Sequence, residues 1–206
     1  MDNQITSNRN LTLLTDFYEL TMMYGYFKHG KQDEIATFDV FFRPFEESNF
    51  CIAAGLQQAV EYIESIHFGK EEIDYLRSTN AFDEEFLAWL ADFKFTGTVK
   101  AIPEGTVVFP FEPLMTVTAP ICQAQLLEAA LLNIINFQTL IATKARRICY
   151  AASPASVLEF GLRRAQAPDA SIYGARAAVI GGCSSTSYVL CAQMFGMDPK
   201  GTHAHS

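Results

Sequence analysis

The stretch Ser156-Val157-Leu158-Glu159-Phe160-Gly161-Leu162-Arg163-Arg164 decides the fold that this sequence predicts. Its first five residues have the length and composition of a short strand, and a helix is predicted over 171–179. A short strand and loop over 181–187, a helix over 188–195 and a third strand beginning at Gly201 continue the pattern. Strands that alternate with helices in this way predict a parallel sheet or barrel.

The residues before this stretch predict a different organisation, with helices interspersed with short strands. Helices are expected over 11–30, 55–66, 70–78 and 82–92, a strand over 35–43, and three short strands with tight turns over 96–119. A long helix over 120–152 is apolar on two sides, so we expect it to be buried between layers. The fold class predicted is therefore α/β, with an N-terminal α+β domain over 1–125 and the long helix and first βα units of a sheet or barrel over 126–206.

A complete barrel of eight βα units needs about 250 residues, and this sequence holds only two units and the start of a third. We therefore expect the chain to be the front part of a longer protein. The sequence contains no uninterrupted apolar run of about 18 residues and no basic-then-apolar leader, so neither a membrane span nor a signal peptide is expected. Five cysteines, an odd number set in apolar segments, favour buried reduced thiols in a cytoplasmic protein.

The charge of the chain is distributed unevenly. The net charge of −8 argues against a nucleic-acid partner. Residues 1–140 hold 8 basic and 20 acidic side chains, a balance of −12, whereas residues 141–206 hold 7 and 3, a balance of +4. The basic excess indicates either a site for a small anion or pairing with carboxylates of the first part, and the counts alone do not choose between them.

Three polar features are predicted at the carboxyl ends of successive strands, where α/β folds bind their ligands. They are Arg163 with Arg164, Gly182 with the hydroxyl side chains after it, and the segment Thr202-His203-Ala204-His205. Side chains of an extended segment alternate, so His203 and His205 share a face. A metal-binding pair and two structural histidines are both possible, but no carboxylate or thiol ligand lies beside them, and we expect no metal site.

Four blocks of the sequence resemble nicotinate phosphoribosyltransferases, and they occur in that family's order. The blocks are Leu14-Thr15-Asp16-Phe17-Tyr18-Glu19-Leu20-Thr21-Met22, Phe41-Phe42-Arg43, Glu159-Phe160-Gly161-Leu162-Arg163-Arg164-Ala165-Gln166 and Gly201-Thr202-His203-Ala204-His205-Ser206. The resemblance runs through the whole chain and covers the first half or so of a family member. The chain departs from the family pattern at Tyr188, where an asparagine is expected.

The resemblance implies an N-terminal α/β domain joined to an irregular α/β barrel, in a cytoplasmic homodimer. The implied reaction, the first step of NAD salvage, forms nicotinate mononucleotide and pyrophosphate from nicotinate and phosphoribosyl pyrophosphate. ATP hydrolysis, with Mg²⁺ accompanying the phosphates, is coupled to it through a phosphohistidine. By the same resemblance, His205 is that histidine. Nicotinate is bound by Arg163 and Thr202 and by Tyr18 of the partner subunit. The residues near phosphate or ribose are Gly182, Ser184, Gly201 and Ser206.

Two alternatives remain beside this interpretation. A nicotinamide-using relative would have an aspartate near the loop at 181–187 to accept the amide, and this chain has Ser184 and no acid there. A non-catalytic relative that binds pyridine nucleotides would have no need of His205. Because the family's downstream phosphate-binding and ATP-binding segments are absent, we expect the chain alone to be inactive.

Overall fold

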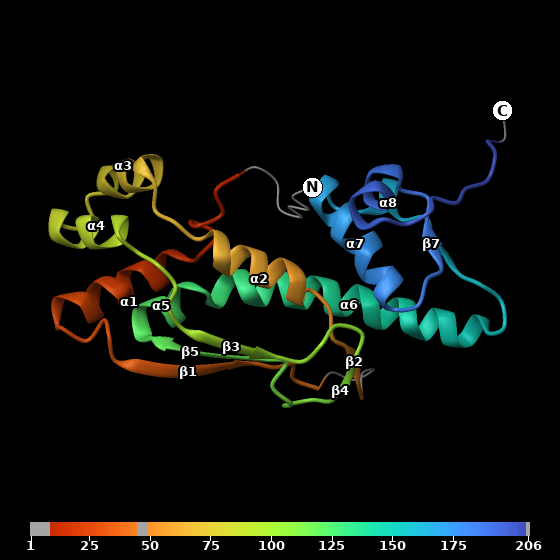
Figure 1. Ribbon diagram of the computed structural model, residues 1–206, viewed down its shortest axis with the longest axis horizontal. Coiled ribbons are helices and arrows are strands. Elements are labelled where there is room, and N and C mark those ends of the chain that lie inside the picture. The colour runs from red at the N-terminus through yellow and green to blue at the C-terminus, as the bar shows by residue number, and fades with distance from the viewer. Residues whose placement is uncertain (1–8, 45–48, 205–206) are drawn as a thin grey trace.

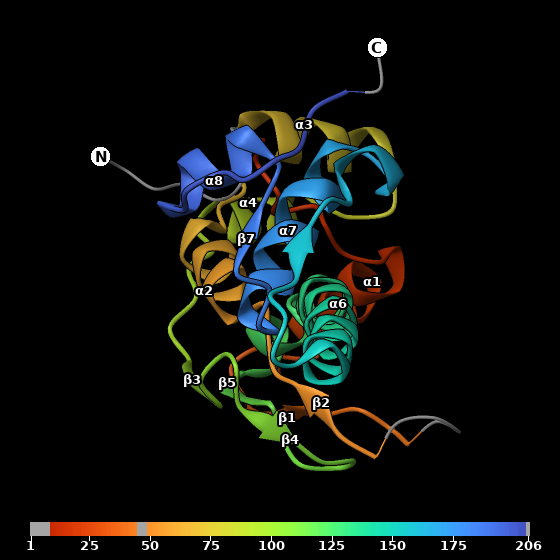
Figure 2. The same ribbon diagram turned by 90° about the vertical axis from the view of Figure 1, so that its right-hand side faces the viewer.

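The computed structural model describes residues 9–44 and 49–204. The molecule is elongated along helix α6 (Glu128–Ala152), which runs through it as a spine (Figure 1). The N-terminal helices and strands surround the first part of α6, and the last elements of the chain pack on its second part. Viewed along this axis, the antiparallel strands lie on one side of α6, and α7 (Pro168–Ile180) and α8 (Val189–Phe195) lie on the other (Figure 2).

The N-terminal part contains two small antiparallel sheets. One has the order β1 (Ile35–Val40), β5 (Met115–Pro120) and β3 (Thr98–Ala101), and the other pairs β2 (Cys51–Ile52) with β4 (Val107–Val108). The side chains of β5 alternate between buried and half-buried, because one face of the sheet packs on the helices. The three expected strands over 96–119 are confirmed, whereas β2 was not predicted.

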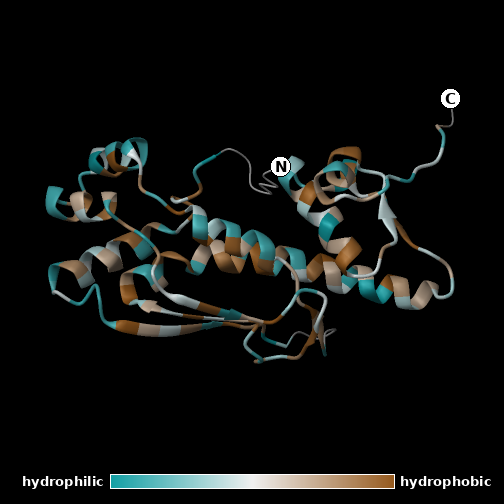
Figure 3. Cartoon of the chain, viewed as in Figure 1, coloured by the Kyte–Doolittle hydropathy of each residue, from teal (hydrophilic) through white to brown (hydrophobic). Residues whose placement is uncertain are grey.

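Five helices among the described residues enclose the core of this part. They are α1 (Phe17–Lys28), α2 (Leu56–Ser65), α3 (Lys70–Ser78), α4 (Glu84–Ala91) and α5 (Ile121–Leu126). Figure 3 shows α2 with hydrophilic residues on its outer side and hydrophobic residues toward α6, as its buried Ala59, Tyr62 and Ile63 require. Among the described residues, no helix combines the length and the apolar character that crossing a membrane requires.

The single long helix predicted over 120–152 is two helices, α5 and α6, which meet at Leu127. Glu19, a fully buried residue of α1, lies at this junction. Its carboxylate accepts the backbone N–H of Asp16 at 2.9 Å and that of Ala129 at 3.0 Å. One side chain thus caps the first turns of α1 and α6, so a helix can begin at Glu128. The acceptor lies 110 residues away in sequence, which explains why a local pattern does not reveal the break.

The last part of the chain contains the expected alternation of strands and helices. β6 (Leu158–Glu159) pairs in parallel with β7 (Ser185–Thr186), and the 3-10 helix η1 (Leu162–Arg164) follows β6. The strand predicted from Gly201 is wrong for residues 201–204, which are not in a strand. Lys200 alone donates its backbone N–H to the carbonyl of Thr186, at 3.0 Å, so no ladder of hydrogen bonds extends along the segment.

The mixture of helices and strands confirms the α/β class. The boundary predicted at residue 125 stays a prediction. A side-chain network crosses it, since Arg176 of α7 contacts Glu104 of the turn before β4, Gln57 of α2 and Gln138 of α6. The two parts of the chain therefore share a polar contact as well as the spine helix.

Candidate functional site

A hollow of about 670 Å³ lies at the carboxyl ends of the two parallel strands. It is bordered by the residue after β6, by η1, by the start of α8 and by the final described segment. The lining residues are Phe160, Arg163, Ser187, Val189, Pro199, Lys200, Gly201, Thr202, His203 and Ala204. This is the edge at which the sequence predicts a ligand site.

Glu159, the last residue of β6, directly precedes Phe160, which lines this hollow. One carboxylate oxygen accepts the hydroxyl of Thr186 at 2.5 Å, and the other accepts the backbone N–H of Gly161. Its backbone carbonyl accepts the N–H of Ser187 at 3.0 Å. The carboxylate therefore joins the two strand ends and fixes the turn from which η1 presents Arg163.

The charged side chains that line the hollow are both cations, Arg163 and Lys200. Neither takes part in an ion pair with any residue that the structure describes. The hydroxyl of Thr202 and the ring of His203 add hydrogen-bonding groups. A guanidinium offers a planar set of donors that matches a carboxylate or a phosphate. The arrangement is suited to a small anionic ligand.

Several predicted residues meet in this hollow. Arg163, Thr202 and Gly201 line it, and His203 lines it as well. His205 and Ser206 lie outside the described residues, although Ala204, the last described residue, lines the hollow. Within residues 9–44 and 49–204, no cluster of three or more His, Cys, Asp or Glu side chains could hold a metal ion.

The expectation that Gly182 and Ser184 lie at a strand's carboxyl end is wrong. β7 begins only at Ser185, so both residues precede it, and the Ser184 N–H and hydroxyl bind the carbonyl of Val157 before β6. They lie at the amino ends of the strands, and the later hydroxyl residue Ser187 takes the expected place. The reason is that the chain needs residues 181–184 to pass over α6 before it can join the sheet.

Tyr18 lies far from this hollow within the same chain. It is in the first turn of α1, near Glu128 in the first turn of α6, whereas β7 lies beside the second part of α6 (Figure 1). Its side chain is 45% exposed, and Glu128 is among the acidic residues near its hydroxyl. Desolvation of the hydroxyl, together with the Glu128 carboxylate, raises the pKa of Tyr18 to about 12. One chain therefore does not bring Tyr18 together with Arg163 and Thr202.

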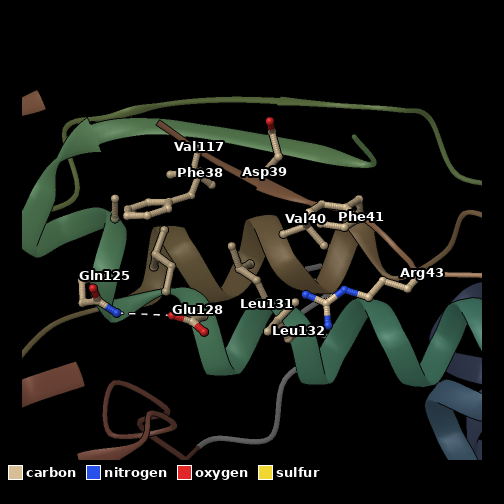
Figure 4. Close-up of a pocket in the computed structure, with 12 residues that line it drawn as sticks. Phe38, Asp39, Val40, Phe41, Arg43, Val117, Gln125, Glu128, Leu131 and Leu132 are labelled. Carbon is tan, nitrogen blue, oxygen red and sulfur yellow. Dashed lines mark hydrogen bonds between the residues drawn. The ribbon is translucent and has the colours of Figure 1, made fainter. Parts of the chain in front are cut away.

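A second hollow, of about 410 Å³, lies between β1 and the helices α5 and α6 (Figure 4). Phe38, Phe41 and Leu132 form part of its apolar lining and are 40–46% exposed. Glu128 also lines it and accepts a hydrogen bond from Gln125 at 3.3 Å. In Figure 4 Arg43 extends from the end of the β1 segment toward α6. No site was predicted on this face, although Phe41 and Arg43, which line the hollow, belong to the block Phe41-Phe42-Arg43.

Other residues that line the first hollow were not predicted as site residues: Phe160, Ser187, Val189, Pro199 and Lys200. Lys200 directly precedes Gly201, and it is one of the 7 basic residues that give residues 141–206 their positive balance. That basic excess was the available signal. The excess could not be assigned to Lys200 from the sequence alone, because the ion-pair partners of the other basic residues were unknown.

The fold and the first hollow define a class: an α/β protein that presents a cationic site for a small ligand at the ends of parallel strands. The comparison with family models is more specific. Residues 13–136 match the nicotinate phosphoribosyltransferase (NAPRTase) N-terminal domain. The chain therefore belongs to the nicotinate phosphoribosyltransferase family.

Individual relatives agree with this assignment. The nicotinate phosphoribosyltransferase of Bacillus subtilis is 45% identical over 199 residues, which are 96% of this chain and 40% of the relative. The crystal structure of human nicotinic acid phosphoribosyltransferase superposes with a TM-score of 0.85 at 36% identity, covering 93% of this chain and 39% of that one. A nicotinate-nucleotide pyrophosphorylase from Pyrococcus furiosus gives 0.75 at 25% identity, covering 100% and 44%. The chain thus spans only about two fifths of the relatives it matches.

Proposed function

We propose that this chain belongs to an enzyme that forms nicotinate mononucleotide and pyrophosphate from nicotinate and phosphoribosyl pyrophosphate. Family membership supports the proposal, and the curated relatives carry the name of this activity. The observation that carries it is the position of Arg163, whose guanidinium lines the same hollow as Lys200 and Thr202 and has no ion-pair partner among the described residues. An unpaired arginine in a ligand-sized hollow fits the carboxylate of nicotinate.

The proposed reaction needs positioning and charge stabilisation more than proton transfer. The pyridine nitrogen of nicotinate carries its own lone pair, so it attacks the ribose carbon as the bond to pyrophosphate breaks, and no general base is required. Positive charge develops on the sugar while negative charge passes to the pyrophosphate. In this scheme Arg163 and the hydroxyl of Thr202 hold the carboxylate and so orient the ring, and Lys200 adds positive charge near the phosphates.

We also propose that ATP hydrolysis is coupled to the reaction through a phosphohistidine at His205, with Mg²⁺ arriving on the phosphates. The support is the position of the residue in sequence, directly after the described segment that lines the cationic hollow. The basic side chains there suit a phosphorylated group. Residue Gly201, which has no side chain, allows phosphate to approach the backbone closely.

The proposed active unit is a cytoplasmic homodimer in which Tyr18 of each subunit reaches the partner's hollow. Within one chain, helix α1, which carries Tyr18, lies away from β7 (Figure 1), and this separation supports the proposal, as does the 45% exposure of the Tyr18 side chain. An aromatic ring presented at an interface can stack on a pyridine ring.

The experiment compares Arg163→Ala with Arg164→Ala in the full-length protein. Arg164 is the matched control, because it belongs to the same 3-10 helix but does not line the hollow. A charge-assisted hydrogen bond contributes roughly 1.5–3 kcal/mol, so Arg163→Ala should raise the KM for nicotinate at least about tenfold. Arg164→Ala should leave it within about twofold. Equal effects of the two variants, or an unchanged KM in Arg163→Ala, would remove Arg163 from the site.

A further inference from the structure

Two cysteines outside the candidate site lie close together. The Sγ atoms of Cys149, near the end of α6, and Cys183, in the turn between α7 and β7, are 4.0 Å apart and 34 residues apart in sequence. All five cysteines lie within the described residues; Cys149 is partly exposed, and the other four are buried. The pair therefore combines a thiol that an outside reagent can reach with a second thiol directly behind it.

The backbone holds this arrangement in place from both sides. A Cβ atom on Gly181 would lie 2.3 Å from the carbonyl oxygen of Ala142, so only glycine lets the turn lie directly on α6. Gly182 has a φ of +115°, and a Cβ there would meet the Cys149 sulfur at 3.6 Å. The N–H of Cys183 donates to the carbonyl of Ala178 at 3.0 Å. The proximity of the two thiols follows from the packing of a fixed turn.

We propose that Cys149 and Cys183 form a reversible modification site, in which a hydroperoxide converts the two thiols into an intramolecular disulfide. A disulfide needs its sulfurs at about 2.05 Å. The observed separation of the sulfurs is about 2 Å longer than this bond, so the two sulfurs need to approach each other by that amount. The inference does not depend on the proposed function.

The chemistry assigns a different role to each thiol. Burial raises the pKa of Cys183 to about 12, and the neighbouring Cys149 contributes a smaller part of this increase. Cys183 therefore stays protonated at neutral pH. The more exposed Cys149 is therefore the sulfur that attacks peroxide. The Arg146 guanidinium and the Cys149 sulfur both lie within 4 Å of the Gly182 Cβ position, at 3.8 Å and 3.6 Å, so a cationic side chain lies near the pair.

Atoms and electrons balance in both steps of the proposed oxidation. The Cys149 thiolate attacks one peroxide oxygen, the O–O bond breaks, and sulfenic acid and hydroxide form; the sulfur is oxidised by two electrons and the peroxide is reduced. The Cys183 sulfur then attacks the Cys149 sulfur, the S–O bond breaks, and the thiol proton leaves with the hydroxide as water. A dithiol reductant reverses the cross-link by forming its own disulfide.

The cross-link would join the end of α6 to the turn that precedes β7. It closes a loop of 34 residues, which restricts the unfolded chain more than the folded one. Oxidation should therefore raise the melting temperature, by about a few °C in the larger full-length protein. Addition of dithiothreitol should remove this gain.

The experiment treats the purified full-length protein with hydrogen peroxide, alkylates it in urea with iodoacetamide, digests it and maps the peptides by mass spectrometry. We expect a linked pair of peptides that contain Cys149 and Cys183 and that separate on reduction. Cys122 and Cys191, both buried and outside the pair, should be alkylated and serve as internal controls. Cys149→Ser should lose both the linked peptides and the gain in melting temperature.

Three outcomes would overturn the proposal. The first is full alkylation of Cys149 and Cys183 after oxidation. The second is over-oxidised Cys149 with Cys183 still free, which would show that the second thiol does not trap the first. The third is a melting-temperature gain that persists in Cys149→Ser, or a disulfide that joins two chains.

Discussion

Arg176 and Glu104 form a shielded ion pair across the predicted domain boundary, and its removal should destabilise the protein strongly. The pair is bidentate, with Nη1 to Oε1 at 2.8 Å and Nη2 to Oε2 at 2.6 Å, and the side chains are only 11% and 19% exposed. Glu104 also accepts the backbone N–H of Gly55 at 2.6 Å. Arg176 donates further to Gln57 and Gln138.

The perturbation is Glu104→Gln, which keeps the shape of the side chain and removes its charge. Leaving a buried charge unpaired costs about 3–5 kcal/mol, whereas exposed ion pairs contribute roughly 0.2–1 kcal/mol. Arg176 keeps its hydrogen bonds to Gln57 and Gln138, so we expect a cost at the lower end of the range for a buried unpaired charge. Glu104→Gln should lower the free energy of unfolding by about 3 kcal/mol. Burial acts to raise the pKa of Glu104, but the hydrogen bond and charge of Arg176 outweigh it, and the net shift is downward.

The sign of this shift fixes the pH dependence. A lowered carboxyl pKa contributes stability above the pKa of the unfolded state, and this stability is lost as pH falls through the folded-state pKa. The difference between wild type and Glu104→Gln should therefore be largest at neutral pH and shrink in acid. Urea unfolding, monitored by circular dichroism, measures this difference in stability. It should appear as a shift of the urea midpoint with no change in how steeply the unfolding free energy depends on urea concentration.

The matched control is Asp74→Asn, which breaks the exposed pairs with Lys70 and Arg77. It should cost less than about 1 kcal/mol. The double variant Glu104→Gln/Arg176→Met removes both charges and should recover much of the lost stability. A cost for Glu104→Gln no larger than that of the control, or a double variant as unstable as the single one, would refute the reasoning.

Three further predictions concern other parts of the chain. Burial raises the pKa of Glu19 to about 7, so wild-type stability should fall as pH rises from 4.5 through about 7, by about 3 kcal/mol at most; urea unfolding of Glu19→Gln should lack this slope. Gly181→Ala places a methyl group 2.3 Å from the carbonyl oxygen of Ala142 and should destabilise the protein by about 1–3 kcal/mol, measured by thermal unfolding, with Gly201→Ala, in open space, as control. Inactive Tyr18→Ala subunits mixed with inactive His205→Ala subunits should regain activity if the site is shared, and no recovery after confirmed subunit exchange would place the site within one chain.

The sequence predicted those features that depend on local pattern. The helices α2, α3 and α4 lie within about a residue or two of their predicted ranges, because each has a regular apolar face and an acidic or glycine start. The parallel pairing of β6 with β7 followed from the alternation of strands and helices. Arg163 and Thr202 were both expected at the strand ends, and both line the hollow.

The features that were missed depend on contacts between distant residues. The break at Leu127 depends on the Glu19 carboxylate, and the position of Gly182 depends on the close packing of Gly181 against α6. Lys200 became recognisable as a site residue only when the fold placed it beside Arg163. A periodic pattern describes one element at a time, so it could indicate neither these contacts nor the proximity of Cys149 to Cys183.

The central proposal is phosphoribosyl transfer to nicotinate, and the most direct measurement is product formation by the full-length protein. The protein is incubated with nicotinate, phosphoribosyl pyrophosphate, ATP and Mg²⁺, and the products are separated by ion-exchange chromatography, with nicotinamide in a parallel reaction. We predict that nicotinate mononucleotide and pyrophosphate form in equal amounts, that ADP accumulates with them, and that nicotinamide is not converted. A folded protein that consumes no nicotinate, or that prefers nicotinamide, would contradict the account.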